Sequence, residues 1–113
     1  MSAITTHVLD TARGRPAPGV PVSLETLGTD DRWAMVGQGT TDGDGRLREL
    51  VAAGTRTKPG VYRLRFDTAA YFASLGEEGF YPEVTVVFQV RDEKHHHVPL
   101  LLSPFGYSTY RGS

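Results

Sequence analysis

Three consecutive histidines, His95 to His97, are the most conspicuous side chains in this 113-residue sequence that could do chemistry. Alternate side chains of an extended strand point to opposite faces, so His95 and His97 share one face and His96 lies on the other. Two histidines on one face can bind zinc, but a catalytic zinc site needs three protein ligands, and only the distant His7 could supply the third. We therefore expect no functional metal and no cofactor, and we interpret His95 and His96 as solvated or hydrogen-bonded residues at a strand end.

The segment 41–46, Thr-Asp-Gly-Asp-Gly-Arg, begins like a calcium-binding loop, with carboxylates at Asp42 and Asp44. The next ligand position is Arg46, and no glutamate closes the loop. We interpret the segment as a tight turn, because Asp and Gly both tolerate left-handed backbone angles. Cysteine is absent and no Gly-x-Ser-x-Gly motif occurs, so disulfides and cysteine nucleophiles are excluded and an α/β-type serine hydrolase is not indicated.

Glycine and proline, with 13 and 7 residues, divide the chain into short apolar segments, which is typical of an all-β domain with many turns. Alternation predicts that Val20, Val22 and Leu24 share one face. One helix is expected over residues 68–75, with Asp67 or Thr68 capping its start and Gly76 following its end. Strands are expected at residues 4–9, 20–27, 33–40, 61–66, 83–90, 95–102 and 106–111, with a short edge strand at 47–50 and a turn-rich loop at 10–19.

Two of these strands differ in how much apolar surface they would expose. The strand at 61–66 alternates, with Tyr62, Leu64 and Phe66 toward a core and Arg63 and Arg65 on the other face. Segments 84–90 and 98–102 are more continuously apolar, and we expect the strand at 83–90 to be buried on both faces. A single two-layer sandwich with two solvated outer faces would leave part of this surface exposed, so we infer that another subunit covers some of it.

Length and charge narrow the possible functions further. A chain of 113 residues fits one domain, and we expect a single domain over residues 1–113. Twelve basic against 13 acidic residues argue against nucleic-acid or anionic-membrane binding. No signal peptide and no transmembrane stretch are expected, and the absence of cysteine fits a cytoplasmic location.

Four blocks, in order and spread from one end of the chain to the other, resemble the 5-hydroxyisourate hydrolases, a transthyretin-related family. One departure from the family pattern is His96, where a tyrosine is more common; it concerns only a packing contact, because alternation points His96 away from His97. The blocks are TTHVLDT at 5–11 with GRPA at 14–17, TDGDGR at 41–46, HHHVPLLLSP at 95–104, and YSTYRGS at 107–113.

The resemblance implies a transthyretin-like sandwich of two four-stranded antiparallel sheets with one short helix. It also implies a homotetramer, a dimer of dimers with active sites at the dimer–dimer interface. The implied reaction is hydrolysis of 5-hydroxyisourate to 2-oxo-4-hydroxy-4-carboxy-5-ureidoimidazoline in urate degradation.

The resemblance also implies the residues that act. His7 and His97 would position and deprotonate water, with either one as the base, since the ordinary pKa of histidine is about 6.5. Arg46 would bind the substrate carbonyl and stabilise negative charge that develops on it. At the C-terminal end, Tyr110 and Ser113 would bind the substrate in an ordered wall of the site; Arg111 would either contact the substrate or anchor the last strand by an ion pair.

Two other functions compete with hydrolysis. A transthyretin-like carrier would bind a small aromatic ligand in the same channel without catalysis, and it would not need His7, Arg46 and His97 together. A structural or adhesive β-sandwich would have no channel and no excess apolar face. A monomer at micromolar concentration in light scattering would favour the latter.

Overall fold

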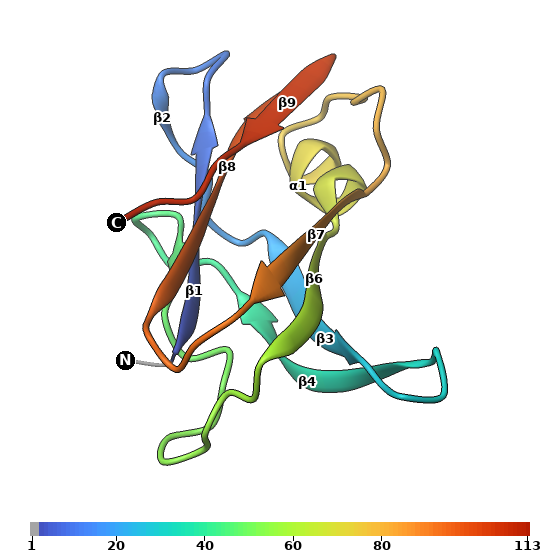
Figure 1. Ribbon diagram of the computed structural model, residues 1–113. Coiled ribbons are helices and arrows are strands. Elements are labelled where there is room, and N and C mark those ends of the chain that lie inside the picture. Colours follow the sequence, from blue (N-terminus) through green and yellow to red (C-terminus); the bar gives the residue numbers. More distant parts are fainter. Residues whose placement is uncertain (1–2) are drawn as a thin grey trace.

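Two β-sheets pack face to face in the computed structural model, which describes residues 3–113 (Figure 1). Met1 and Ser2, which belong to the segment where no signal peptide is expected, lie outside the described residues. The first sheet has the order β2-β1-β8-β9, with β5 also paired to β1, and the second has the order β4-β3-β6-β7. The strands are β1 (Ile4–Asp10), β2 (Arg15–Pro16), β3 (Pro21–Leu27), β4 (Trp33–Thr40), β5 (Arg46–Leu47), β6 (Gly60–Phe66), β7 (Val84–Val90), β8 (His96–Ser103) and β9 (Gly106–Thr109).

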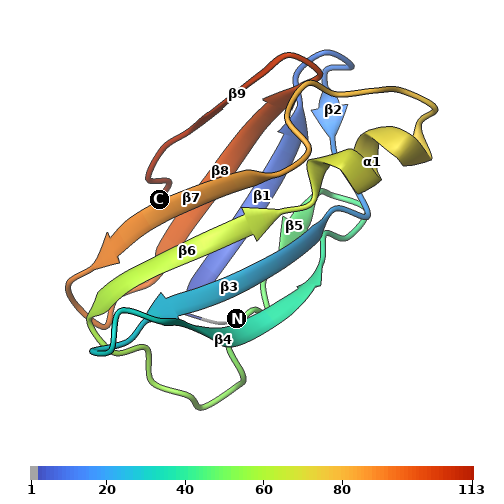
Figure 2. The ribbon, with the colours of Figure 1, turned by 90° about the vertical axis from the view of Figure 1, so that its right-hand side faces the viewer.

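The core lies between the two sheets, whose strands Figure 2 shows from another side. It is built from the inward side chains of both sheets. On β3 and β6, Leu24 pairs with Leu64 and Val22 with Phe66, and all four side chains are buried. The predicted apolar faces at 20–24 and 62–66 are therefore confirmed. Alternation then necessarily places the charged side chains of β6 on the outer face of this sheet.

The fold class predicted for the chain is confirmed, but the first sheet departs from the expected pattern in two ways. It contains five strands rather than the expected four: the longer β1, β8 and β9, and the two-residue strands β2 and β5. One pair is also parallel rather than antiparallel, since β1 and β8 run in the same direction from Ile4↔His96 to Asp10↔Leu102. Parallel neighbours need a long connection, and here the whole second sheet and the helix lie between them in the sequence.

The expected apolar excess is located differently in the structure. The prediction that the strand at 83–90 is buried on both faces is wrong: β7 is an edge strand with alternating burial, and Val87 is 59% exposed. The apolar side chains of β8 are instead covered within the chain, with Val98, Leu100 and Leu102 buried. The exposed large apolar side chains therefore come from the edge strands, with Val87 on β7 and Met35 on β4, and from aromatic residues before β7 and around β9, not from β8.

The predicted helix is confirmed as α1 (Thr68–Ser74), which lies at one end of the sandwich (Figure 2). The side chain of Asp67 accepts a hydrogen bond from the backbone N–H of Ala70, so Asp67 is the cap at the start. Gly76 follows the helix with a positive φ of 70°, as the sequence suggested. Among residues 3–113, no helix is long and apolar enough to cross a membrane.

Candidate active site

Three strands of the first sheet place the predicted site residues on one outer face. Even-numbered residues of β1, such as Ile4 and Val8, are buried in the core, so Thr5 and His7 point outward. The parallel register puts Thr5 opposite His97 of β8, and the antiparallel register puts His7 opposite Arg46 of β5. The sheet therefore gathers residues that lie far apart in the sequence.

A tight turn before β5 fixes the backbone position of Arg46 and that of Asp44, whose carbonyl oxygen contacts His7. Asp42 Oδ1 accepts hydrogen bonds from the backbone N–H groups of Asp44, at 2.9 Å, and of Arg46, at 3.0 Å. These bonds, with the charges of nearby arginines, lower the pKa of Asp42 despite the opposing effect of desolvation. Gly45 has φ 75°, and a Cβ there would lie 2.4 Å from the carbonyl oxygen of Val8, so only glycine fits this close approach. The predicted turn is confirmed.

The imidazole of His7 is held by this turn. Its Nε2 lies 2.8 Å from the carbonyl oxygen of Asp44. A carbonyl oxygen only accepts hydrogen bonds, so Nε2 carries a proton and donates it. In neutral His7, Nδ1 is therefore the nitrogen with the free lone pair.

The imidazole of His97 is held by β1 instead. Its Nδ1 lies 2.8 Å from Thr5 Oγ1, and His95 Nε2 lies 2.8 Å from the same oxygen. Burial lowers the pKa of His97, and repulsion from His95, Arg46 and His7 lowers it further, so this imidazole is neutral at pH 7. His96 is buried on the opposite face, where its Nδ1 pairs with the carbonyl oxygen of Lys94 at 2.7 Å. The predicted alternation of the three histidines is confirmed.

A small cavity of about 130 Å³ opens between these side chains. Arg46 projects into it without an ion pair, because no carboxylate of residues 3–113 lies within 4.0 Å of its guanidinium. Its neighbour Arg48 pairs with Asp42 across 3.6 Å. The cavity is lined by Thr5, Thr6, Arg46, Arg48, His95, His97 and Ser113.

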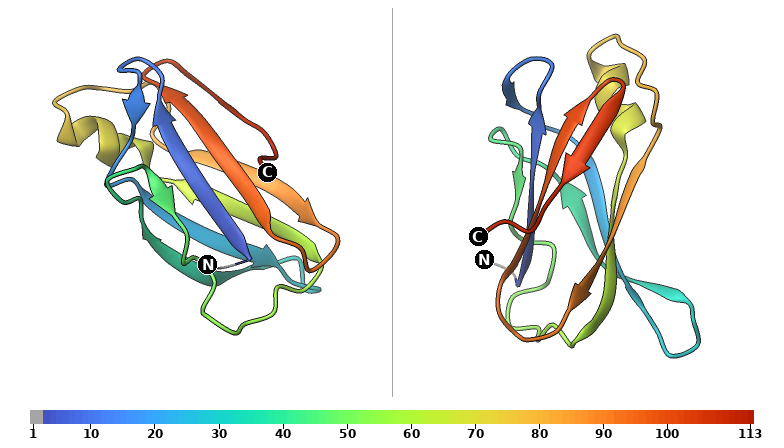
Figure 3. Two further views of the ribbon diagram at one scale, coloured as in Figure 1. Left: turned by 90° about the vertical axis from the view of Figure 1, so that its left-hand side faces the viewer. Right: turned by 45° about the horizontal axis from the view of Figure 1, so that its top comes forward.

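The C-terminal segment forms one wall of this cavity. After β9 the chain continues along β8 in the same direction, and the backbone N–H of Gly112 donates to the carbonyl oxygen of His97 at 2.8 Å (Figure 3). A Cβ on Gly112 would lie only 2.7 Å from His97 Cδ2, so the backbone rests directly on the imidazole. Ser113 continues into the cavity wall.

Tyr110 and Arg111 lie at a second cavity of about 380 Å³, between β7 and the β8–β9 pair. His97 lines both cavities and so connects them. Tyr110 is 56% exposed. Arg111 forms no ion pair with any carboxylate of residues 3–113, so the structure does not show the anchoring ion pair considered as an alternative.

Sequence reasoning missed Thr5 and Arg48 and gave His95 no part in the site. The missed signal was strand alternation: residues two positions from His7, Arg46 and His97 share their faces. No cluster of three or more His, Cys, Asp or Glu side chains forms a metal-binding group within residues 3–113.

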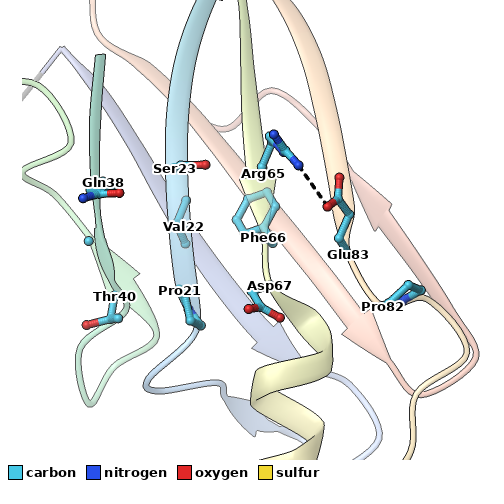
Figure 4. Close-up of a pocket in the computed structure, with 11 residues that line it drawn as sticks. Pro21, Val22, Ser23, Gln38, Thr40, Arg65, Phe66, Asp67, Pro82 and Glu83 are labelled. Carbon is cyan, nitrogen blue, oxygen red and sulfur yellow. Dashed lines mark hydrogen bonds and ion pairs between the residues drawn. The ribbon is translucent and has the colours of Figure 1, made fainter. Parts of the chain in front are cut away.

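A larger hollow lies on the outer face of the other sheet and carries no comparable chemistry. It has a volume of about 680 Å³ and is lined by residues of β3, β4 and β6 and of the segment before β7. Its only arginine, Arg65, is paired to Glu83, as Figure 4 shows, and no histidine lines it. We therefore assign the candidate site to the smaller cavity.

Comparison with known proteins finds relatives of the same length. The model of the HIUase/Transthyretin family matches residues 4–112. The 5-hydroxyisourate hydrolase of Mus musculus is 47% identical over 114 residues, covering 99% of this chain and 96% of the mouse protein. The uric acid degradation bifunctional protein TTL of Arabidopsis thaliana is 46% identical, but the match spans only 37% of that longer protein.

Two solved structures share the architecture. The 5-hydroxyisourate hydrolase of Klebsiella pneumoniae superposes with a TM-score of 0.84 at 37% identity, covering 97% of this chain and 98% of that one. Sea bream transthyretin in complex with thyroxine superposes with a TM-score of 0.91 at 33% identity, covering 98% of this chain and 95% of that one. The same fold therefore occurs in an enzyme and in a protein that binds a small aromatic ligand.

Proposed function

The chain belongs to the HIUase/transthyretin family, and from this premise we propose that it hydrolyses 5-hydroxyisourate in urate degradation at the site of His97, Arg46 and His7. Relatives that align with nearly the whole chain are named 5-hydroxyisourate hydrolase. The chain is therefore a hydrolase and not a carrier without catalysis. The observation that supports the site assignment is the convergence of Arg46 and His97 on one cavity, with His7 beside Arg46.

In the proposed mechanism, His97 is the general base. Its imidazole is neutral at pH 7 because burial lowers its pKa, and it can therefore take a proton from water. The water oxygen adds to a ring carbonyl of the substrate, and the adjacent carbon–nitrogen bond breaks. The proton held by His97 then passes to the departing nitrogen, so the net change is the addition of one water molecule and the opening of the ring.

Arg46 stabilises the negative charge that develops on the attacked carbonyl oxygen. A guanidinium presents a fixed fork of donors, and the one at Arg46 has no carboxylate partner among residues 3–113 that would compete with the substrate. His7 orients the water through its Nδ1, since its Nε2 is engaged by the turn.

The C-terminal residues complete the proposed substrate site. Ser113 lines the catalytic cavity, whereas Tyr110 and Arg111 line the adjoining one, which His97 connects to the first. We assign Tyr110, Arg111 and Ser113 to substrate binding. Because Arg111 has no ion pair within residues 3–113, its guanidinium is available for the substrate.

Decay of freshly generated 5-hydroxyisourate, followed by ultraviolet absorbance with and without the protein, tests this function. The expected result is faster decay with the protein, proportional to its concentration. Equal decay in both samples, combined with saturable binding of an aromatic ligand such as thyroxine, would support the carrier alternative instead.

We also propose that residues 1–113 form a single hydrolase domain that acts in the cytoplasm as a homotetramer, a dimer of dimers. Support for assembly comes from exposed large apolar side chains: Val87 and Tyr110, which line the second cavity, at 59% and 56% exposure, and Phe105, in the turn between β8 and β9, at 79%. Light scattering at micromolar concentration should give four times the chain mass of 12.4 kDa. A mass of one chain would contradict the assembly but not the chemistry.

A further inference from the structure

A buried threonine hydroxyl bridges two histidines at the proposed active site. Thr5 is 3% exposed, and its Oγ1 lies 2.8 Å from both His97 Nδ1 and His95 Nε2. Two other threonines of the same segment, Thr6 and Thr11, instead donate to backbone carbonyl oxygens of β8. Thr5 therefore differs from its neighbours in that its hydroxyl links side chains rather than tying β1 to the backbone of β8.

The hydrogen bonds of this bridge limit which nitrogens carry protons. A hydroxyl has one proton to donate and two lone pairs that accept. If both histidines donated to Thr5, its own proton would be left without a partner in a buried position, which is unfavourable. If both accepted, only one of the two contacts could hold a proton. One histidine therefore donates to Thr5 and the other accepts from it, so their tautomers are linked.

We propose that Thr5 and His95 are positioning residues that fix the tautomer of His97: Thr5 accepts from His97 Nδ1–H and donates to His95 Nε2. In this arrangement the unprotonated nitrogen of His97 is Nε2. The inference rests on the proposed function, in which His97 accepts a proton from water.

Protonation of His97 selects this arrangement over the reverse one, in which Thr5 would accept from His95 Nε2–H and donate to His97 Nδ1. When His97 gains a proton, both of its nitrogens carry one, so Nδ1 must donate to Thr5 and Thr5 must donate to His95. The proposed arrangement already has this pattern, and proton uptake at Nε2 leaves the bridge unchanged. In the reverse arrangement Nε2 is already protonated, and the lone pair of Nδ1 is occupied by the Thr5 hydroxyl.

The surroundings of His97 make its orientation sensitive to this bridge. Arg46 and His7 approach from β5 and β1, and Arg48 and Ser113 line the same cavity. The neighbouring cavity adds Arg111. No carboxylate side chain lines either cavity, so Thr5 takes the place that a carboxylate holds beside many catalytic histidines.

Nitrogen-15 spectra of the histidine-labelled protein at neutral pH test the tautomer directly and do not depend on turnover. The wild type should show His97 protonated at Nδ1 and unprotonated at Nε2. Thr5→Val, which keeps the shape but removes the hydroxyl, should give a mixture of His97 tautomers. Thr5→Ser, which restores the hydroxyl, should return the wild-type pattern.

Kinetics of the same variants provide the second readout. Thr5→Val should lower kcat by about tenfold or more with little change in KM, as expected for loss of a group that orients a catalytic side chain. Thr5→Ser should recover most of that loss. Thr11→Val is the matched control, because it removes a hydroxyl that bonds to β8 away from the site, and it should retain wild-type kcat.

A second pair of variants covers the case in which Thr5→Val does not fold. His95 is exposed, so its replacement does not disturb the core. His95→Gln keeps an acceptor for Thr5 and should retain the Nδ1–H tautomer of His97, whereas His95→Leu should lose it. Wild-type His97 protonated at Nε2, or an unchanged His97 tautomer in either His95→Leu or folded Thr5→Val, would overturn the proposal. An inactive protein with the expected tautomer would overturn the proposed function alone.

Discussion

The outer faces of the two sheets contrast in how their charged side chains are used. On the sheet of β3, β4, β6 and β7, each arginine is neutralised: Arg63 pairs with Glu25 at 2.8 Å and also lies over the ring of Trp33, and Arg65 pairs with Glu83 at 3.2 Å. On the sheet of β1, β5 and β8, Arg46 has no carboxylate partner within residues 3–113 and faces two histidines. The larger hollow lies on the face of β3, β4, β6 and β7, and the proposed catalytic arrangement lies on the face of β1, β5 and β8.

This contrast indicates that volume is a poor guide to function in this fold. The hollow of about 680 Å³ is lined by the carboxylates of Asp67 and Glu83 and by a neutralised arginine, so it offers no imidazole base and no unpaired guanidinium to bind an anion. A cavity of about 130 Å³ with a free guanidinium and a neutral imidazole offers both. The following predictions test whether the two faces are functionally as different as their side chains indicate.

The largest expected effect is from His97→Ala. If His97 is the general base, its removal should lower kcat by about 100-fold or more. The measurement is ultraviolet decay of 5-hydroxyisourate at saturating substrate. Gln38→Ala, a change in the larger hollow, is the control and should retain wild-type kcat. Near wild-type turnover by correctly assembled His97→Ala would remove this histidine from the mechanism.

A matched pair of arginine substitutions compares the two faces directly. Arg46→Met should lower kcat/KM by about 100-fold, because it removes the group that stabilises developing charge. Arg65→Met should leave kcat/KM unchanged and should change the free energy of unfolding only slightly, since Arg65 and its partner Glu83 are both substantially exposed. Similar losses of kcat/KM in the two variants would contradict the distinction between the faces.

Gly112→Ala tests how closely the C-terminal segment positions His97. The added Cβ would lie 2.7 Å from His97 Cδ2, so the imidazole or the segment must shift. We expect kcat/KM to fall by about tenfold, because small displacements of a catalytic group are costly. Gly106→Ala on β9 is the control, since its Cβ would meet only Ser103 Oγ at 3.7 Å. Equal activity of both variants would indicate that this wall is not needed.

The pH dependence of kcat/KM should reflect the protonation of His97, which lies on the first sheet. The pKa of folded His97 lies below its ordinary value of 6.5 because of burial, so the neutral base persists to lower pH. The acid limb of kcat/KM should therefore fall below pH 6.5. Stability follows the same sign: as pH drops through 6.5, the unfolded chain takes up a proton before the folded one, and the free energy of unfolding decreases. An acid limb above pH 6.5 would contradict the assignment.

The smallest expected effect concerns the opposite sheet and appears in stability alone. The hydrogen bond from Arg63 lowers the pKa of Glu25 below 4.5, so its contribution is present above that pH and is lost as pH falls through the folded pKa. Glu25→Gln should cost about 1 kcal/mol at neutral pH in urea unfolding. The difference from wild type should shrink well below pH 4.5, whereas kcat should be unchanged at neutral pH.

Much of the fold was predictable because local patterns determine it. Alternation identified the buried faces of β3 and β6, and the cap at Asp67 located α1. The parallel pairing of β1 with β8 was not predictable from local patterns, because it joins residues about 90 positions apart. The burial of β7 was misjudged for a related reason: its sequence resembles an inner strand, but the sheet order places it at an edge.

The candidate site was predictable only in part. His7, Arg46 and His97 could be named from the sequence motifs, and the structure brings them to one face. Thr5 and Arg48 could not be distinguished from ordinary strand residues, because their place at the cavity depends on register between strands. Tyr110 and Arg111 lie beside the catalytic cavity rather than in it, a distinction that proximity in sequence to Ser113 conceals.

The parallel pairing of β1 with β8 has a consequence for biosynthesis. β1 is synthesised well before its partner β8 and the wall formed by Gly112, because the second sheet lies between them in the sequence. Contacts between residues so far apart in the sequence slow folding. Until these contacts form, the edge of β1 that will pair with β8 has no partner. Catalytic competence should therefore appear only after β8 and Gly112 have left the ribosome and folded, which would make hydrolysis a sensitive reporter of completed folding in pulse-labelled translation.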